Sequence, residues 1–544
     1  MKRLIVLIAF VFAAATAFAG PPSKLAPDLS TKGGVEKVDV IVQFKAHPTA
    51  KDLDAIRGQG GTLKGELPLI KGALFSMPAP ALKGLAHNRA IAYVSPDREI
   101  HGSLAHSSAA VGADIARSYG YDGDGIGVAV IDSGIFDHAD LTDSLGHSKV
   151  VYRENFLTDG VSDDAYGHGT HVAGIIAGGD DASSAGDDRG MAPAAHLIDL
   201  RVLDANGAGS DSALIAAVQR AVQLKDKLNI RVINMSLGRG IFESYRTDPL
   251  CQAVEAAHRA GIVVVVSAGN DGRNNSNGRR GYGTISAPAN DPFVITVGAM
   301  KTKNTMMPGD DEIASYSSKG PAAVDMVIKP DLVAPGNKVV SLQSAGGKLA
   351  VDHPSLQMGN GRLKLSGTSM AAPVVAGAVA LLLDKDPTLS PDQVKARLMK
   401  TAAKSFPLTT TSVDGSGKNY MAQYDIFTIG SGYLDVVAAL NNTDVTSGIA
   451  LSPSASFDET TGIVSIVHGN SLVWGESLVW GESLVWGESL VWGESLVWGE
   501  SLIWGESLIW GESTTKGESI VWGESMIWGE TIVEGEAIAV VGEE

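Results

Sequence analysis

The apolar positions of the chain follow two different patterns, one before and one after about residue 105. In residues 35–100, short alternating stretches such as VDVIVQF and GALFSMP are separated by helical patterns such as TAKDLDAIRGQ and APALKGLAHN. Alternation at every second residue is typical of strands with one buried face. The predicted order is strand, helix, strand, strand, helix, strand, which is the ferredoxin-like arrangement. We therefore expect a small α+β unit ahead of a larger domain.

From about residue 111 to residue 440 the apolar runs become continuous. The runs IGVAVID, HLIDLRVL, RVINMSLG and GIVVVVSAGN are rich in Val and Ile, and helical patterns such as DSALIAAVQRAVQLKDKL lie between them. Strands that are buried on both faces and alternate with helices indicate a parallel α/β sheet. Residues 441–470 show only short strand-like pieces, and we interpret them as a linker or a small β element.

A hexapeptide repeat, Ser-x-x-x-Gly-Glu, fills residues 471–544 and contains all nine tryptophans of the chain. Six residues turn a helix by about 600°, so the tryptophans of a helical repeat would scatter over several faces. An extended chain suits an even period better, so we expect a β-solenoid or a disordered tail. The unit offers no nucleophile, base or metal cage. Exposed tryptophans suit a carbohydrate, cell-surface or protein partner, and a stalk without a partner is the alternative.

The first twenty residues, MKRLIVLIAFVFAAATAFAG, have the pattern of a secretory signal. Lys2 and Arg3 precede an apolar run that ends at a small-x-small cleavage site, AFA. The run is too short for a membrane anchor and no second span follows, so we expect no membrane span. We expect a secreted or extracellular protein, with surface-associated and periplasmic locations included. The predicted parts are a signal peptide (1–19), the small unit (20–105), the main domain (106–440), a linker (441–470) and the repeat tail (471–544).

The net charge of −18 is concentrated in the repeat tail. Residues 471–544 contain fourteen Glu and one Lys, a net charge of −13, which leaves −5 for the rest of the chain. This balance argues against a nucleic-acid partner, because phosphate binding requires clustered Lys and Arg. Cys251 is the single cysteine. No disulfide can form within the chain, so an exported protein of this kind relies on a large core, a bound ion, or both.

Three short segments contain the residue types of acyl transfer. Asp132 ends the strand VAVIDSGI, His168 precedes a helical run in YGHGTHVAGIIAG, and Ser369 opens another in LSGTSMAAPVVAGAVALLL. In such a set, serine attacks a carbonyl, histidine takes the proton and a buried aspartate orients the imidazole. In a fourth segment, VVVVSAGND, Asn270 lies just past a buried strand. Its amide and the backbone N–H of Ser369 are candidate donors to the oxyanion that forms.

Five segments, VAVIDSGI, GHGTHVAG, VINMSLG, VVVVSAGN and LSGTSMAAP, resemble the signature segments of the subtilisin-like serine proteases. Subtilisin also has the chain order Asp, His, Ser. The resemblance covers roughly residues 110–440 and implies a three-layer α/β fold with a parallel sheet. It implies Asp132, His168 and Ser369 as the triad and Asn270 as the oxyanion donor. Val374 stands where many members have a histidine, but this position is not part of the triad.

The resemblance also implies where a substrate binds. One edge is Ser236, Leu237 and Gly238, the facing edge is Gly207 to Gly209, and Ala268 and Gly269 line the specificity pocket, with Ser286 near its base. A peptide between two edges is held by its backbone more than by its side chains. The small residues imply a roomy apolar pocket with broad preference, although RNNSNGRRGYGTI, residues 273–285, looks inserted nearby and bears on its shape.

The unit at 20–105 is similar to the propeptides of this family, which assist folding and inhibit the enzyme until they are cut away. The implied cut lies within residues 98–108. The family needs no cofactor for catalysis but often binds structural Ca²⁺, for which clustered carboxylates are suitable ligands. The matching residues are Asp140 together with Asp181 and Asp187 in an acidic loop, and Asp159, Asp163 and Asp164 form a second candidate. A solvated acidic loop is the alternative.

Two functions remain open from the sequence. The first is a secreted endopeptidase, made as an autoprocessed precursor, that cuts protein or peptide substrates through an acyl-enzyme intermediate. The second is a non-catalytic extracellular adhesion or assembly protein that acts through the Trp-Gly-Glu repeat. The intact set of catalytic residue types favours the first. A related acid-acting peptidase with a glutamate base is excluded, because GHGTH places His168 where that glutamate would be.

Overall fold

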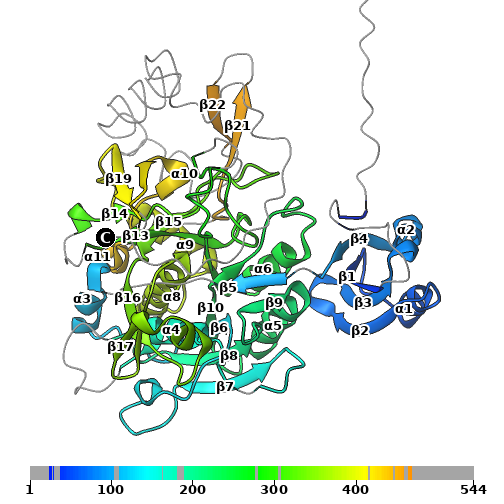
Figure 1. The fold of residues 1–544 in the computed structure, drawn as a ribbon, viewed down its shortest axis with the longest axis horizontal. Helices are drawn as coiled ribbons and strands as arrows, with labels where there is room; N and C mark the ends of the chain where they lie inside the picture. The colour runs from blue at the N-terminus through cyan, green and yellow to red at the C-terminus, as the bar shows by residue number, and fades with distance from the viewer. Residues whose placement is uncertain are drawn as a thin grey trace, which may run out of the picture.

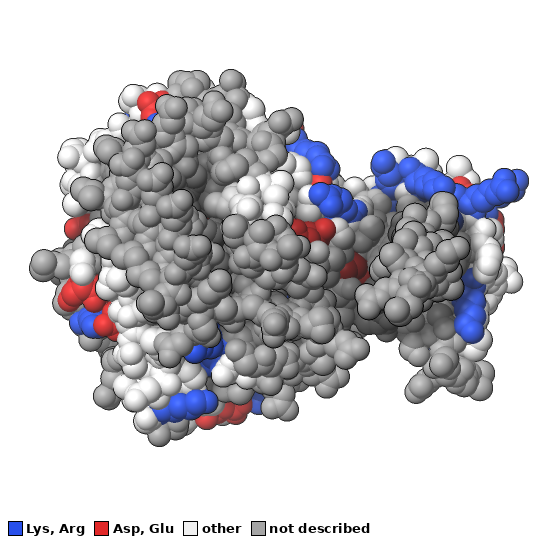
Figure 2. Space-filling model, turned by 90° about the horizontal axis from the view of Figure 1, so that it is seen from above, with Lys and Arg blue, Asp and Glu red and all other residues white. Residues whose placement is uncertain are grey.

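The computed structural model describes most of the 544-residue chain. The described residues are 24–26, 29, 37–97, 99–102, 109–161, 163–179, 189–275, 280–303, 308–414, 417–444, 448–458 and 463–467. The predicted signal peptide, the repeat tail and the acidic loop with Asp181 and Asp187 lie outside this set. Figure 1 shows a large body with a smaller N-terminal lobe beside it, and Figure 2 shows the same two lobes from above, with Lys and Arg side chains on the smaller one.

The smaller lobe has the order of elements that its hydrophobic pattern predicts. These are β1 (Lys37–Phe44), α1 (Ala50–Arg57), β2 (Thr62–Leu67), β3 (Gly72–Pro78), α2 (Leu82–His87) and β4 (Ile91–Pro96). The four strands form an antiparallel sheet in the order β2-β3-β1-β4. A capping box opens α1, because the Thr49 side chain accepts from the Asp52 N–H while the Asp52 carboxylate accepts from the Thr49 N–H. The lobe has a hydrophobic core of its own, which includes Val40, Val42 and Phe75.

The large body is built on a mostly parallel sheet. Its strand order is β14-β13-β12-β10-β6-β8-β7, and β15 also pairs with β13. At its centre, β6 (Gly127–Asp132) lies between β8 (His196–Arg201) and β10 (Ile230–Met235), and both pairings are parallel. These strands read as continuous Val and Ile runs because both of their faces are buried. The outer strands are β7 (Val150–Asn155), β12 (Val263–Ser267), β13 (Ile295–Lys301), β14 (Glu312–Ile313) and β15 (Leu332–Pro335), and β14 pairs antiparallel with β13.

Helices cover both faces of this sheet and give the three layers that the sequence predicts (Figure 1). Successive side chains of a strand point to opposite faces, so β6 serves two cores. Val128 and Val130 pack with α4 (His168–Ala177) and α8 (Thr368–Lys385). Ala129 and Ile131 pack with α5 (Asp211–Leu224) and α6 (Pro249–Arg259) on the other face.

Shorter elements complete the described part of the body. The strands are β5 (Glu99–Gly102), β9 (Ala208–Ser210), β11 (Leu237–Gly238), β16 (Val339–Leu342), β17 (Gln357–Gly359), β18 (Arg362–Leu365), β19 (Thr409–Val413), β20 (Asn419–Gln423), β21 (Ser454–Asp458) and β22 (Ile463–Val467). The helices are α3 (Ala113–Ser118), α7 (Lys348–Asp352), α9 (Pro391–Thr401), α10 (Ile426–Ile429) and α11 (Val436–Asn441). The strands form one three-stranded sheet of β11, β5 and β9 and a second of β16, β18 and β17. Two further pairs, β19 with β20 and β21 with β22, form hairpins.

The described part of residues 441–470 is a β element of the body and not a linker. Strands β21 and β22 form an antiparallel hairpin, and Ala455 and Val464 on it are buried in the main core. The Ile328 N–H donates to the Pro453 carbonyl at 2.8 Å, and the Ala455 N–H donates to the Met326 carbonyl at 2.8 Å. The segment has few apolar residues, but their burial against the body fixes its position.

A buried charge cluster joins the segment before β21 to the main sheet. The Asp331 carboxylate lies 2.7 Å from Lys329 Nζ and 3.2 Å from Lys395 Nζ, and all three side chains are buried. Lys395, on α9, also donates to Ser452 Oγ at 2.8 Å and to the Val294 carbonyl at 2.9 Å. Burial lowers the pKa of Lys395 to about 7. Burial alone would raise the pKa of Asp331, but the two lysines hold it below its usual value.

Helix α8 is, within the described residues, the one helix long and apolar enough to cross a membrane by length and composition. Its apolar stretch is 89% buried inside the body. A core helix passes the same test, and α8 is the helix at the centre of the main core.

We expect Asp331→Asn to lower the free energy of unfolding by about 3–5 kcal/mol, because it removes the carboxylate that pairs directly with two buried ammonium groups. The control is Asp444→Asn, which breaks an exposed pair with Lys400 and should cost only about 0–1 kcal/mol. Urea unfolding followed by far-UV circular dichroism, in a Ser369→Ala background, measures both. Equal losses in the two variants would contradict the role assigned to the cluster.

Candidate active site

Asp132 and His168 are in direct contact in the interior of the body. Asp132 is the last residue of β6 and is 1% exposed. His168 is the first residue of α4, which can begin there because Gly167 takes a φ of 97° in the left-handed region. His168 Nδ1 and Asp132 Oδ1 are 2.6 Å apart. This contact keeps the imidazole proton on Nδ1 and leaves Nε2 as the basic nitrogen.

Ser369 is the second residue of α8 and is buried. Its hydroxyl donates to the Ser236 carbonyl oxygen at 3.0 Å, and Ser236 Oγ donates to the Ser369 carbonyl oxygen at 2.5 Å. Helices α8 and α4 pack against each other, so the helices that carry Ser369 and His168 are neighbours. In this arrangement the serine proton points to Ser236. The hydroxyl must therefore rotate before His168 can accept its proton.

Asn270 is oriented by the residue that precedes the serine. Its Oδ1 accepts from the Thr368 N–H at 2.8 Å and from Thr368 Oγ1 at 3.3 Å. Thr368 Oγ1 also donates to the Gly269 carbonyl at 3.1 Å. Because the amide oxygen is held in this way, the amide NH₂ is directed away from Thr368. The Asn270 NH₂ and the Ser369 N–H are therefore suited to bind an oxyanion.

A segment of the chain itself lies between the two expected substrate edges. Strand β5 pairs antiparallel with β11 on one side and with β9 on the other. Gly102 faces Leu237 across the first pairing. Ile100 faces Gly209 across the second. A strand added between two edges is the β-augmentation mode of peptide binding, so residues 99–102 lie where the resemblance implies a substrate backbone.

The small residues expected in the specificity pocket converge on Ser286. A Cβ added to Gly238 would lie 2.6 Å from Ser286 Oγ, and one added to Gly269 would lie 2.8 Å from Ser318 Oγ. Ser286 Oγ also donates to the Ala268 carbonyl at 3.3 Å. The structure thus brings together the segments that the resemblance implied, and a side chain at position 238 or 269 would collide with them.

Position 207 also requires glycine for a steric reason. It takes a φ of 76°, and an added Cβ would lie 2.6 Å from the Tyr166 ring. The Tyr166 ring centroid is 6.3 Å from that of His168. Tyr166 therefore packs between the turn before β9 and His168.

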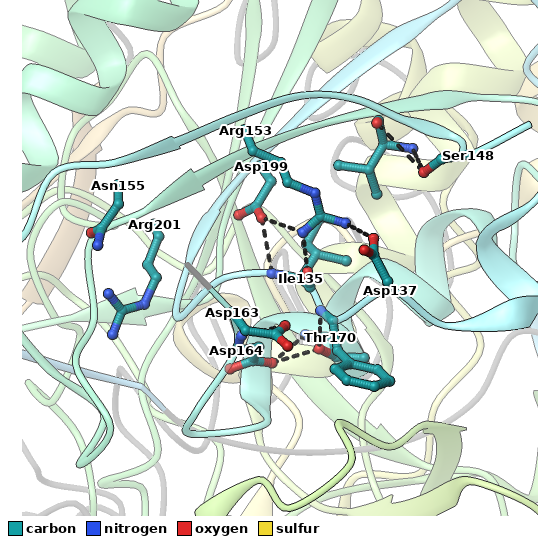
Figure 3. A network of polar contacts seen from close by, with 12 residues as sticks. Ile135, Asp137, Ser148, Arg153, Asn155, Asp163, Asp164, Thr170, Asp199 and Arg201 are labelled. Atoms are coloured by element: carbon teal, nitrogen blue, oxygen red, sulfur yellow. Dashed lines mark hydrogen bonds and ion pairs between the residues drawn. The ribbon is translucent and has the colours of Figure 1, made fainter. Parts of the chain in front are cut away.

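Asp164, four residues before His168, connects the segments that carry the two contacting residues (Figure 3). Its Oδ1 accepts from Ser133 Oγ at 2.8 Å and from the Gly167 N–H at 2.7 Å. Its Oδ2 accepts from the Thr170 N–H at 2.9 Å and from Thr170 Oγ1 at 2.6 Å. Burial raises the pKa of Asp164. Ser133 follows Asp132 directly, so one carboxylate fixes the end of β6 relative to the start of α4.

A second carboxylate supports the turn after Asp132. Asp199 Oδ2 accepts from the Ile135 N–H at 3.1 Å and from Arg153 Nη1 at 3.1 Å (Figure 3). Arg153 also pairs with Asp137. Burial raises the pKa of Asp199 to about 7. The three residues hold the backbone that leaves the catalytic strand.

His171 lies one helical turn after His168 and is fully buried. Its Nε2 donates to the Leu363 carbonyl at 3.0 Å, which ties α4 to β18. Burial lowers the pKa of His171 to about 3. The ring therefore stays neutral at ordinary pH and has a structural role.

The described carboxylates of the calcium candidates already have partners. Asp140 Oδ2 accepts from Arg362 Nη2 at 2.6 Å. Asp159 pairs with Arg201 at 2.7 Å, and Asp164 accepts four hydrogen bonds. In the part of the chain that the structure describes, no group of three or more His, Cys, Asp or Glu is placed to hold a metal ion. Asp140, Asp159 and Asp164 therefore do not form a cation cage, and Asp181 and Asp187 lie outside the described residues.

Comparisons with known proteins agree with this geometry. A profile of the subtilase family matches residues 123–420. Serine protease AprX of Bacillus subtilis (strain 168) is 38% identical over 301 residues, which are 54% of this chain and 65% of AprX. Subtilisin E of the same strain is 35% identical over 405 residues, which are 73% of this chain and 93% of subtilisin E. The chain spans slightly less than two thirds of AprX and nearly all of subtilisin E.

Among solved structures, fervidolysin from Fervidobacterium pennivorans, a keratinolytic enzyme related to subtilisin, is similar with a TM-score of 0.59. The match covers 82% of this chain and 67% of fervidolysin at 23% identity, so it shows the fold alone. The chain belongs to the subtilase family. It is a subtilisin-like serine endopeptidase.

Two supporting residues do not stand out in the sequence as parts of the site. Asp164 was expected as a calcium candidate, but its carboxylate is saturated by donors around His168. The sequence feature that could have predicted this contact is the spacing, because Asp164 precedes the first residue of α4 by only four positions. Asp199 carries no such signal, because it meets Ile135 and Arg153 only through strand pairing.

We expect Asp164→Asn to lower kcat more than it changes KM, because the amide NH₂ would face donors that now contact a carboxylate. The unsatisfied donors should lower the free energy of unfolding by about 1–3 kcal/mol. The control is Asp163→Asn, which changes an exposed neighbour whose Oδ1 accepts from the Asp164 N–H at 2.9 Å. Steady-state kinetics on a peptide substrate and urea unfolding measure both effects. Equal kinetics in the two variants would show that Asp164 does not position the histidine.

We expect His171 to destabilise the protein in mild acid. Its pKa is about 3 when folded and near 6.5 when unfolded, so below pH 6.5 the unfolded chain binds the proton more tightly. The stability that the neutral ring contributes is complete above pH 6.5 and is lost as the pH falls toward 3. His171→Gln should lose less stability than the parent between pH 7 and pH 4 in urea unfolding. Identical pH slopes would contradict the assignment.

Proposed function

We propose that the chain is a secreted serine endopeptidase that hydrolyses peptide bonds through an acyl-enzyme intermediate and is made as a self-processing precursor. The observation that carries the proposal is the 2.6 Å contact between His168 Nδ1 and Asp132 Oδ1, with His168 on a helix that packs against the one whose second residue is Ser369. Membership of the subtilase family supports the same chemistry.

In the first half-reaction, His168 Nε2 takes the proton of the Ser369 hydroxyl while Oγ attacks the carbonyl carbon of the substrate. Asp132 stabilises the imidazolium, and Asn270 and the Ser369 N–H donate to the oxyanion. The imidazolium then protonates the leaving amine, and the C–N bond breaks. In the second half-reaction, His168 takes a proton from water while the water oxygen attacks the acyl carbon. The imidazolium then returns the proton to Ser369 Oγ as the C–O bond breaks, which releases the acid and restores the serine.

We propose that a substrate binds as an extended strand between β11 and β9. The pairing of β5 with both edges supports this geometry, because it uses backbone groups alone. Recognition through the backbone suits many sequences, and the small residues around Ser286 add little selectivity. Protein and peptide substrates of broad sequence are therefore the proposed class.

The smaller lobe is proposed to be the inhibitory propeptide. It contacts the body where Gln43 Nε2 donates to the Thr247 carbonyl at 3.0 Å and Tyr93 OH donates to Glu243 at 2.8 Å. Asp97 accepts from the Ser212 N–H at 2.6 Å in the first turn of α5, where the helix dipole favours a carboxylate. The segment that follows Asp97 forms β5, which lies between β11 and β9 where the substrate strand is proposed to bind. The lobe thus carries its own C-terminal segment into the site.

Export, calcium and the tail remain predictions. The signal pattern at 1–19 supports secretion, and calcium binding would involve residues of the acidic loop together with Asp140. A surface or carbohydrate partner for the tail rests on its repeated tryptophans. All of these segments except Asp140 lie outside the described residues.

We expect the precursor to be cut after Ser103. The described β5–β11 register ends with Gly102 opposite Leu237, the neighbour of Ser236, whose carbonyl accepts from Ser369 Oγ at 3.0 Å. We therefore expect the cut one residue beyond Gly102. Intact mass and N-terminal sequencing should show wild-type protein that begins at Leu104. Ser369→Ala should retain everything after the signal peptide.

The control is Ser118→Ala, which changes an exposed serine on α3 and should be processed like wild type. A Ser369→Ala protein that is still cut at residue 103 would show that another protease makes the cut. Wild-type protein that stays whole and does not hydrolyse casein would contradict the proposed function.

A further inference from the structure

The insertion after Asn270 forms one wall of a cavity of about 300 Å³. We call it the basic pocket, and it is lined by Gly272, Arg273, Asn275, Arg280, Ser315, Lys319, Lys418, Asn419, Tyr420, Met421 and Ala422. Four of these residues are cationic and none is acidic. The catalytic steps use none of them. The pocket is therefore a concentration of positive charge on a chain whose overall charge is −18.

An aromatic ring lies among the cations of the basic pocket. The Arg273 guanidinium and the Lys418 ammonium are each 5.0 Å from the Tyr420 ring centroid. Lys319 lies 5.3 Å from the Tyr282 ring centroid, and burial lowers its pKa to about 8. An anion in the pocket would offset that cost of burial. The chemistry of the lining suits a ligand with both a carboxylate and an aromatic ring.

Both walls of the pocket are anchored to the body. The Gly272 N–H donates to the Tyr316 carbonyl at 2.8 Å, and the Asp271 N–H donates to Ser318 Oγ at 3.0 Å. The opposite wall is the hairpin of β19 and β20, which Lys301 holds through a 2.9 Å hydrogen bond to Ser412 Oγ. The lining is thus positioned before a ligand arrives.

We propose that the basic pocket binds the acidic Trp-Gly-Glu units of the chain's own C-terminal tail. Each intact unit places a tryptophan two residues before a glutamate, and Gly-Glu recurs eleven times between Gly475 and Gly535. The tail carries −13 from fourteen Glu and one Lys. The unit therefore supplies the aromatic ring and the carboxylate that the lining suits.

The tail has the reach and the number of units that such binding needs. From Val467, the end of β22, to Glu544 there are 77 residues (544 minus 467). An extended chain spans up to about 3.3 Å per residue, so the first units already cross the face of a domain. Figure 1 shows β19 at the same end of the body as β21 and β22. Tethering and repetition raise the effective concentration of a weakly held unit.

Tail binding would fix the repeat beside the segment that carries Asn270. It does not depend on proteolysis, so it can be tested in the full-length Ser369→Ala protein, which cannot process itself through that serine. All nine tryptophans lie in the tail, so tryptophan emission reports on the tail alone.

The first experiment joins amines to carboxylates with a carbodiimide and maps the cross-links by mass spectrometry. We expect Lys418 to be linked to tail glutamates, and we expect the links to disappear as NaCl is raised, because exposed ion pairs are screened. The matched control residues are Lys225 and Lys227, on a different face at the end of α5. Tail links that favour these two lysines equally would overturn the proposal. A mixture of isotope-labelled and unlabelled protein distinguishes links to the tail of the same chain from links to the tail of another copy. Links found only between different copies would overturn binding within one chain.

The second experiment compares acrylamide quenching of tryptophan in the Ser369→Ala parent, an Arg280→Ala/Lys418→Ala variant and a Lys225→Ala/Lys227→Ala control. We expect stronger quenching and a shift of emission to longer wavelength in the pocket variant alone. A tryptophan-free acidic peptide, (SLVYGE)₃, should produce the same change in the parent, and its neutral form, (SLVYGQ)₃, should not. Equal quenching in all three proteins would overturn the proposal.

A third measurement separates the tail from acidic substrates. With Ser369 restored, the pocket variant and wild type are compared for kcat/KM on an acidic and a neutral peptide. A selective loss on the acidic peptide, without any change in tail quenching or cross-linking, would show that the basic pocket serves substrates and would overturn tail binding.

Discussion

The contact between Asp132 and His168 depends on where a parallel strand ends and a helix begins. Asp132 is the last residue of the central strand β6, and His168 is the first residue of α4. The carboxylate and the imidazole therefore meet at the carboxyl ends of the parallel strands. The buried carboxylate of Asp164 keeps these two backbone segments together through Ser133, Gly167 and Thr170. The remaining parts of the site, α8 with Ser369 and the loop with Asn270, are then placed by packing on the same sheet.

The smaller lobe and the body are connected by the same kind of interaction that a substrate would use. Strand β5 adds its backbone to β11 and β9, while Asp97 caps α5 and side chains such as Tyr93 bind the body beside it. Because backbone pairing is largely independent of side chains, one cleft suits both a built-in segment and a range of peptides. The lobe adds contacts of its own, which explains how a segment without a special sequence can hold that place.

The charges of the chain are divided between parts that do not share a sequence pattern. Residues 106–470 carry a net charge of −10 and the tail carries −13, whereas the basic pocket collects Arg273, Arg280, Lys319 and Lys418 from three separate segments. Of the four cations of the basic pocket, Arg280 and Lys418 are exposed.

The sequence by itself determined the order of elements, the layered α/β class, the residue types of the triad and the oxyanion asparagine, because hydrophobic period and local motifs are short-range properties. It predicted the pocket glycines only through resemblance, and it offered Asp164 only as part of a second calcium candidate. Tertiary structure alone decided that Asp164 is saturated by donors around His168, that Asp140 pairs with Arg362, and that Ala450, Ala455 and Val464 belong to the core. These outcomes depend on partners that are distant in the chain, and no local pattern encodes which carboxylate meets which cation.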